Sequence, residues 1–325
     1  MLKAAIYILT QNNTERKVYL KTSLYFLFKN FNAKYKYPII ILHEGDYDNE
    51  SQKEIILSIR GDCQSLIKFQ ELDSEDFKVP NHIDNNKLKR CIDIKPVPYW
   101  RNIKYRIMCN FWVKHFFKYC KEYDYVMRLD DDSIIEEPIN QDIFNLMKER
   151  DLNYMSNIVH IDCSICNYGM KEFFETLYPN KKEKLKELFM EHKLDNNSKY
   201  FNKFKELYEN IHGEEYKKDT VDMNMPLMYY NNFCVTKPSI WNTKEIKNIV
   251  NEIDKKGYIF YYRWGDAPLH TLIMTLYDNK KLAKLSFKYS KRLQREAFKD
   301  DDGNLHSFMP SSYDNSSCIS KKHLS

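Results

Sequence analysis

The stretch "YDYVMRLDDDS", residues 123–133, runs from a short apolar strand directly into three aspartates. In open α/β sheets ligands bind beyond the carboxyl ends of the strands, so an acidic cluster at such an end predicts a binding site. Side chains alternate along an extended chain, which places Asp130 and Asp132 on one side and Asp131 on the other. Two carboxylates on one side repel each other unless a cation joins them, and hard oxygen ligands suit Mn²⁺ or Mg²⁺ shared with phosphate oxygens. The alternative is a solvated acidic turn, because short acidic motifs are common by chance.

The segments that precede this stretch alternate between strand and helix patterns. Residues 4–9 and 37–42 are apolar runs of strand length, and residues 15–31 carry apolar side chains at helical spacing. This alternation predicts an α/β fold with a mostly parallel central sheet and helices on both faces.

The second half of the chain has weaker patterns. Residues 171–225 are rich in Lys and Glu, and their helical periodicity predicts solvated helices that cover one face. Residues 258–262 are expected to form a strand. Without repeats or a flexible linker, we expect one domain over residues 1–298 and a C-terminal tail over residues 299–325, where the periodicity is lost.

Charge and apolar runs restrict the possible partners. The chain has 51 Lys and Arg against 46 Asp and Glu, a net charge of +5. This mild excess is far from that of a nucleic-acid binder, so no nucleic-acid partner is expected, but it suits a small anionic ligand such as a nucleotide. The N-terminal apolar run, residues 4–9, is too short for a signal segment or a membrane span, and no other run approaches that length. The cysteines have no framework spacing, and reduced thiols are expected.

A second distinctive string, "YYRWGDAPLH", covers residues 261–270. Asp266 is placed to cap a helix, and His270 lies near the start of that helix, where a neutral imidazole is favoured. The neutral imidazole is also the form that binds metals. The alternative is an ordinary, partly buried histidine beside a capping aspartate. Trp264 is either a packing residue or one that presents an edge to an acceptor.

The two strings, in this order, resemble those of the fungal-type α-1,2-mannosyltransferases of glycoproteins and glycolipids. That family has an Arg-x-Glu-Pro-Asp strand end and a later Tyr-Glu-Arg-Trp-Gly-Asp-Ala-Pro-x-His string. The segments 31–48, 105–111 and 232–266 are similar to further blocks of the family, and the similarity runs from about residue 4 to 290.

The resemblance implies a GT-A fold, GDP-mannose as donor, a Mn²⁺ cofactor and transfer with retention of configuration onto a hydroxyl of a glycan or glycoprotein. By position, it implies metal binding by Asp130, Asp132 and His270. It assigns Tyr105 and Arg128 to the donor site, and Thr10 to the loop that meets the nucleotide. Arg106 or Arg263 would add positive charge near the phosphates.

The resemblance also assigns catalytic and acceptor residues, with two departures. Asp266 would orient the acceptor hydroxyl or accept its proton, and helix capping is the alternative. Cys234 aligns with a family carboxylate that is a candidate nucleophile, and Tyr262 replaces a family glutamate. Tyr262 and Trp264 are predicted to contact the acceptor. A same-face mechanism needs no enzyme nucleophile.

The departures leave other functions open. Loss of two carboxylates near the sugar is compatible with another nucleotide sugar, or with an inactive sugar-binding or nucleotide-binding protein that keeps the fold. A phosphohydrolase with an acidic metal site is a third hypothesis. The family acts in the secretory lumen behind an N-terminal anchor, but no anchor is recognised in this sequence, so we expect a cytoplasmic protein.

Overall fold

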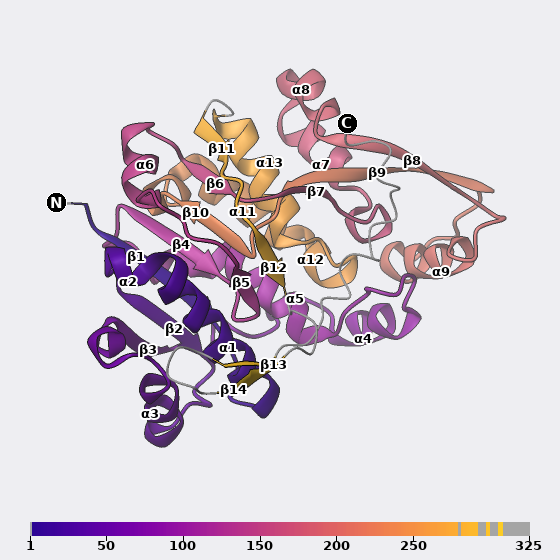
Figure 1. Ribbon diagram of the computed structural model, residues 1–325. Coiled ribbons are helices and arrows are strands. Elements are labelled where there is room, and N and C mark those ends of the chain that lie inside the picture. Colours follow the sequence, from indigo (N-terminus) through magenta and orange to yellow (C-terminus); the bar gives the residue numbers. More distant parts are fainter. Residues whose placement is uncertain (1, 279–280, 292–296, 300–304, 308–325) are drawn as a thin grey trace.

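The structure is a computed structural model that describes residues 2–278, 281–291, 297–299 and 305–307 (Figure 1). Its centre is a seven-stranded sheet with the order β11-β6-β10-β4-β1-β2-β3. The strands are β1 (Ala4–Leu9), β2 (Ile39–His43), β3 (Ile67–Glu71), β4 (Tyr125–Leu129), β6 (Tyr154–Ser156), β10 (Phe233–Thr236) and β11 (Leu282–Lys284). Only β10 runs antiparallel to its neighbours, β4 and β6. The predicted α/β fold with a mostly parallel sheet is confirmed.

Both faces of this sheet are buried, as its nearly continuous apolar strands require. In β1, Ile6 and Ile8 belong to one core cluster and Ala5 and Tyr7 to the other, so alternate side chains enter opposite layers. The first layer is completed by α1 (Thr14–Leu27), α3 (Asn49–Leu57) and α6 (Ile143–Glu149). The second is completed by α5 (Ile103–Asn110), α11 (Lys244–Lys256), α12 (Tyr258–Tyr261) and α13 (Asp266–Asp278).

The prediction of solvated helices throughout residues 171–225 is wrong in part. The helices α7 (Met170–Leu177), α8 (Lys182–Lys186) and α9 (Phe201–His212) are present, but β8 (Phe189–Asp195) and β9 (Thr220–Tyr229) form a long antiparallel hairpin around α9. With β7 (Val159–Ile161) they make a separate three-stranded sheet, which projects beside the central sheet (Figure 1). Val221 and Met223, two residues apart and both buried, are the strand signal that the Lys- and Glu-rich composition obscured.

The predicted strand at residues 258–262 is also wrong, because the structure has the short helix α12 there. Gly257 ends α11 with a left-handed backbone, φ 69°, and the chain turns directly into the next helix. Tyr258 and Phe260 are buried against neighbouring helices. Aromatic residues favour strands, but this preference is weak and tertiary packing overrides it.

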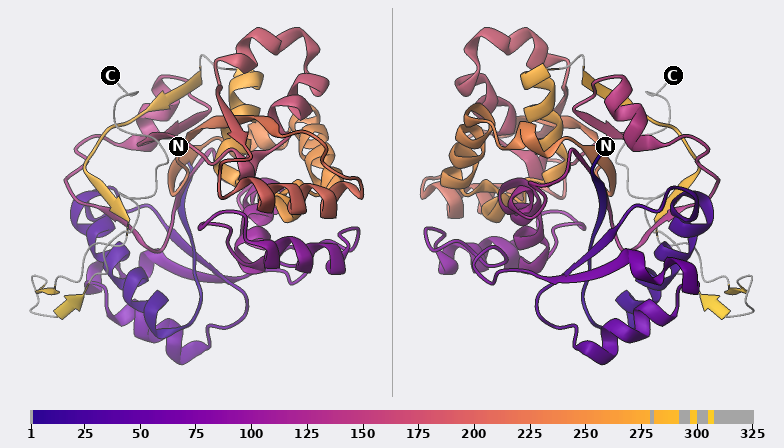
Figure 2. Two further views of the ribbon diagram at one scale, coloured as in Figure 1. Left: turned by 90° about the vertical axis from the view of Figure 1, so that its right-hand side faces the viewer. Right: turned by 90° about the vertical axis from the view of Figure 1, so that its left-hand side faces the viewer.

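A strand near the C-terminus, β12, pairs with the short strand that follows the acidic stretch. Strand β5 (Ser133–Ile135) follows the aspartates directly and pairs antiparallel with β12 (Tyr289–Lys291). Further on, β13 (Ala297–Lys299) pairs with β14 (Leu305–Ser307), which lies against α1 at the edge of the molecule (Figure 2). This pair crosses the domain boundary expected at residue 298, and most of the expected tail lies outside the described residues.

The remaining elements connect these layers. They are η1 (Phe28–Asn32), α2 (Ala33–Tyr35), η2 (Gly61–Leu66), α4 (Asn85–Ile94), η3 (Phe111–His115), η4 (Phe116–Lys118), η5 (Ile165–Asn167), η6 (Pro179–Lys181) and α10 (Pro238–Trp241). Among the helices of the described part of the chain, none combines the length and apolarity that crossing a membrane requires.

Candidate functional site

A polar cavity of about 180 Å³ lies at the carboxyl end of β4, beside the N-terminus of α13. It is lined by Arg16, Arg101, Tyr105, Met108, Arg128, Asp130, Asp132, Asp162, Met228, Tyr230, Asn231, Asn232, Arg263, Gly265, Asp266, Ala267, Pro268 and Lys291. These residues come from both ends of the chain, and the acidic stretch lies where the strand-end rule predicts a ligand site.

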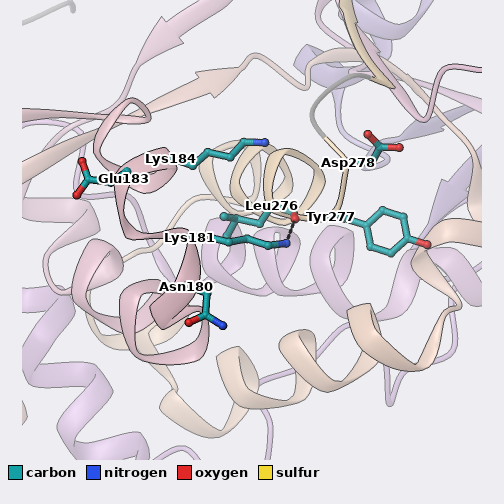
Figure 3. A pocket seen from close by; sticks show the side chains of 7 residues that line it. All are labelled: Asn180, Lys181, Glu183, Lys184, Leu276, Tyr277 and Asp278. Atoms are coloured by element: carbon teal, nitrogen blue, oxygen red, sulfur yellow. Dashed lines mark hydrogen bonds between the residues drawn. The ribbon is translucent and has the colours of Figure 1, made fainter.

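A larger hollow of about 590 Å³ lies at the opposite end of α13, against η6 and α8 (Figure 3). Lys181 donates a hydrogen bond to the carbonyl of Leu276 there. The side chains of Glu183 and Tyr277 point away from each other, so the polar groups of this hollow do not converge. A binding site needs convergent polar groups, and we therefore take the smaller cavity as the candidate site.

The alternation predicted for the three aspartates is confirmed. Asp130 and Asp132 line the cavity, whereas Asp131 does not. Asp131 turns toward β1 and accepts a hydrogen bond from Thr10 Oγ1 at 2.7 Å. Burial raises the pKa of Asp131 to about 7. Thr10 is itself buried and does not line the cavity, so its predicted place beside the nucleotide is not supported.

Three cations neutralise the acidic pair. Arg128 Nε lies 3.0 Å from Asp130 Oδ1, and Arg16 Nη1 lies 3.5 Å from Asp132 Oδ2. Lys291 Nζ lies 3.2 Å from Asp130 Oδ2 and 3.3 Å from Asp132 Oδ1, and so bridges the two carboxylates.

Asp266 forms a buried ion pair with Arg128. Its Oδ2 also accepts a hydrogen bond from Asn231 Nδ2 at 2.8 Å, and its Oδ1 accepts one from Cys109 Sγ at 3.3 Å. Burial alone would raise the pKa of Asp266, but the adjacent Arg128 outweighs it and the pKa is lowered. An ionised, fully bonded carboxylate is a weak base. Because the carboxylate of Asp266 is engaged by Arg128, a role as catalytic base is not supported. Because α13 begins at Asp266 itself and not after it, the capping role is not supported either.

Two arginines flank Tyr105 in the lining of the cavity. The guanidinium carbons of Arg101 and Arg263 lie 5.6 and 5.5 Å from the centre of its ring. Arg263 also contacts Asp162 Oδ1 at 3.5 Å. Both arginines have left-handed backbones, φ 62° and 69°, a conformation that is costly for residues other than glycine and is found preferentially at functional sites.

The structure does not bring His270 to the acidic pair. Its ring is buried behind Asp266, where Nε2 bonds the carbonyl of Trp112 at 3.1 Å and the ring centre lies 4.4 Å from that of Trp241. Burial lowers its pKa to about 4, so the imidazole is neutral, as expected for the helix start. Within the described residues there is no group of three His, Cys, Asp or Glu side chains that could hold a metal. Metal binding by His270 stays a prediction, which its contacts with Trp112 and Trp241 do not support.

Two further predicted site residues lie in the core. Arg106 is buried, with its guanidinium bonded to the carbonyls of Phe260 and Trp100, so it braces α5 against α12. Cys234 lies beside Arg128 in the sheet but does not line the cavity. Burial raises the pKa of its thiol to about 11. A neutral, enclosed thiol cannot replace a carboxylate nucleophile.

The two residues predicted to contact an acceptor are also buried. Trp264 donates from Nε1 to the carbonyl of Tyr168 at 3.0 Å, and the hydroxyl of Tyr262 lies 3.0 Å from Nε2 of His212. Neither lines the cavity. The packing alternative for Trp264 is therefore the one that the structure supports, and Tyr262 takes the same role.

Sequence reasoning missed several lining residues. Asn231 and Asn232 lie in the turn before β10, where Asn232 begins a segment that the resemblance already singled out, and their amides bond Asp266 and Asp130. The sequence around Arg16, Asp162 and Lys291 carries no local signal, and only their positions in the fold bring them here.

Comparisons with known proteins agree with this architecture. A sequence profile described as Glycolipid 2-alpha-mannosyltransferase matches residues 1–293. The O-glycoside alpha-1,2-mannosyltransferase omh1 of Schizosaccharomyces pombe is 25% identical over 281 residues, which is 85% of this chain and 65% of omh1. The Glycolipid 2-alpha-mannosyltransferase of Saccharomyces cerevisiae is 24% identical over 279 residues, which is 84% of this chain and 57% of that protein. The chain thus spans less than two thirds of the length of these relatives.

Two solved structures share the fold. The mannosyltransferase Ktr4p from S. cerevisiae, in complex with GDP, has a TM-score of 0.68 at 19% identity, over 89% of this chain and 71% of that one. Core-mannan synthase A from Aspergillus fumigatus, in a Mn/GDP form, has a TM-score of 0.66 at 20% identity, over 89% and 74%. The fold is thus of the GT-A type. Because the sequence profile covers nearly the whole chain, the protein belongs to the Glycolipid 2-alpha-mannosyltransferase family.

Proposed function

We propose that the protein is a metal-dependent, retaining glycosyltransferase that moves mannose from GDP-mannose to a hydroxyl of a glycan or glycoprotein. The observation that carries this proposal is the pair Asp130 and Asp132, which lies on the cavity wall at the end of β4 and shares a cation. Family membership supports the reaction, and the GDP bound to a structurally similar mannosyltransferase supports the nucleotide.

The residues present fit a divalent cation. The ammonium of Lys291 already lies between the two carboxylates, which shows that positive charge is accommodated there. Carboxylate oxygens are the ligands that Mn²⁺ and Mg²⁺ prefer, and Asp130 and Asp132 would hold the ion. Bound there, it would neutralise charge on the departing nucleoside diphosphate.

The other lining residues would orient the donor. Arg128 lies 3.0 Å from Asp130 and is itself held by Asp266, so it positions the carboxylate. Arg263 and Tyr105 also line the cavity and would offer a guanidinium and a phenol to phosphate or sugar oxygens. This distribution matches the charge of a nucleotide sugar, with cations for the phosphates around a neutral sugar.

Transfer on a single face of the sugar requires no enzyme nucleophile. This route suits the chain because the thiol of Cys234 is neutral and enclosed. The acceptor hydroxyl would enter beside the leaving group, and the diphosphate would accept its proton.

An inactive nucleotide-binding protein is the second candidate. The observation in its favour is the loss of the family carboxylate at Cys234, together with the full engagement of Asp266 by its neighbours. A transferase that uses another nucleotide sugar would use the same cations and carboxylates to bind the diphosphate of its donor. Release of GDP or another nucleotide, dependent on Mn²⁺ and on a sugar donor, separates an enzyme from an inactive binder. The cytoplasmic location stays a prediction that fractionation of cells can test.

The donor site is tested by thermal shift with GDP-mannose and other nucleotide sugars, with and without Mn²⁺. A ligand at 100 times its Kd stabilises the folded protein by about 2.7 kcal/mol, so binding raises the melting temperature measurably. We expect Asp132→Asn to abolish the Mn²⁺-dependent part of the shift, because one of two ligand carboxylates loses its charge. Glu183→Gln, in the larger hollow, is the control and should leave the shift unchanged. A full Mn²⁺-dependent shift in Asp132→Asn would rule out this site.

A further inference from the structure

The strand β12 brings a lysine to the acidic pair from the far end of the chain. In its pairing with β5, Lys291 is the partner of Ser133, and Ser133 directly follows Asp132. The register of two short strands therefore places the ammonium at the carboxylates. The side chain of Lys291 is only 16% exposed, and it lines the candidate cavity.

The three cations around the pair differ in how firmly they are held. Arg128 is tied to Asp266 as well as to Asp130, and it packs on the ring of Trp112 at 4.1 Å. Arg16 lies 3.2 Å from Asp131 and 3.5 Å from Asp132, and thus serves a buried carboxylate that faces away from the cavity.

Lys291 is the cation that bridges the two cavity-facing carboxylates, at 3.2 and 3.3 Å. Lysine is a point charge on a flexible stem, whereas arginine is held by a planar fork of donors, so the lysine can move with the least loss of fixed geometry.

We infer that the ammonium of Lys291 takes the place of a metal ion in this site. It occupies the position between Asp130 and Asp132, where it competes with a divalent ion. When no metal is bound, it supplies positive charge to a diphosphate. The inference rests on the proposed function for the identity of the ligand. It adds that the chain binds the diphosphate even when no metal is present, although sugar transfer still requires the metal. A bridging ammonium and a bridging metal ion cannot share one position, so each weakens the binding of the other.

The test uses the full chain with Lys291→Met and two companions. Lys291→Arg keeps the charge, and Lys288→Met removes a charge from an exposed lysine of the same segment that pairs with Glu136 outside the cavity. The affinity for Mn²⁺ alone is measured by electron paramagnetic resonance of the free ion, and the affinity for GDP is measured by calorimetry with EDTA and with Mn²⁺.

The expected results have opposite signs, which a merely structural role would not produce. Lys291→Met should bind Mn²⁺ alone roughly tenfold more tightly, because a competing charge at close range is removed. It should bind GDP in EDTA roughly tenfold more weakly, and added Mn²⁺ should restore that affinity. Lys288→Met should resemble the wild type, and Lys291→Arg should keep the GDP affinity in EDTA because it keeps the charge.

The inference would be overturned if wild type and Lys291→Met had the same affinity for Mn²⁺ and the same affinity for GDP in EDTA. It would also be overturned if neither protein bound Mn²⁺. The two proposals fail separately. Tighter Mn²⁺ binding by Lys291→Met without any sugar transfer would leave the inference standing and remove the transferase. Mn²⁺-dependent sugar transfer by the wild type, with Mn²⁺ and GDP affinities that Lys291→Met leaves unchanged, would do the reverse.

Discussion

The acidic stretch at 128–132 and the string at 261–270 are equally prominent in the sequence, but the fold uses them differently. The first presents both of its alternate carboxylates, Asp130 and Asp132, to the cavity. In the second, Arg263, Gly265, Asp266, Ala267 and Pro268 line the cavity, whereas Tyr262, Trp264 and His270 are buried in the core.

The difference lies in what decides the direction of a side chain. At the end of a strand, the direction follows from the two-residue period of the backbone and from the place of the strand in the sheet. At the start of a helix, it depends on the rotation of the helix against its neighbours, and the period of 3.6 residues does not specify that rotation. A cluster at a strand end is therefore the stronger sequence evidence for a site.

The largest effect that can test this contrast is expected at Asp266. Asp266→Asn leaves the buried guanidinium of Arg128 without its charged partner, and breaking a buried pair in this way costs about 3–5 kcal/mol. Chemical denaturation measures the loss in free energy of unfolding. The double variant with Arg128→Met should recover part of it, and additive losses would show that the pair is not coupled.

His270 gives a pH-dependent test that is nearly as large. Its folded-state pKa of about 4 lies below the ordinary value of 6.5, so between these values the unfolded chain binds more protons than the folded one. Stability should therefore fall as the pH drops from 6.5 to 4, by roughly 3 kcal/mol from this residue. The difference between wild type and His270→Leu, followed by denaturation across this range, isolates its contribution from that of the other histidines.

The same variant decides whether the second string holds a metal. His270→Leu should lose roughly 1–3 kcal/mol because the carbonyl of Trp112 is left unpaired. It should nevertheless keep the Mn²⁺-dependent thermal shift with GDP-mannose, since the imidazole does not line the cavity. Loss of that shift in a variant that still folds would restore His270 to the site.

The smallest expected effect concerns the backbone strain at Arg263. Glycine adopts a φ of 69° without the cost that a side chain carries, so Arg263→Gly should be about 1 kcal/mol more stable than Arg263→Ala. Both variants lack the guanidinium and should bind the donor equally weakly. Equal stability of the two would show that the left-handed backbone stores no strain, and unequal donor affinity would show that the loop conformation affects binding.

Several features of fold and site were predictable for physical reasons. The strands at 4–9 and 37–42 are continuous apolar runs of the right length, and both form in the central sheet. Asp130 and Asp132 could be assigned to one side because the strand before them is regular. The hairpin of β8 and β9 was missed because the Lys- and Glu-containing helices α7, α8 and α9 dominate the pattern of residues 171–225, and α12 was missed because its aromatic residues favour strands in isolation.

By itself, the sequence determined the α/β order of elements, the acidic strand end and the family, because periodicity and motif spacing are properties of the chain. Only the tertiary structure decided which polar residues meet. Lys291 reaches Asp130 and Asp132 through the register of β12 on β5, whereas His270, one turn after Asp266 on α13, packs into an aromatic core. Contacts between residues far apart in the chain depend on the packing free energy of the whole molecule, and a local sequence pattern does not determine that free energy.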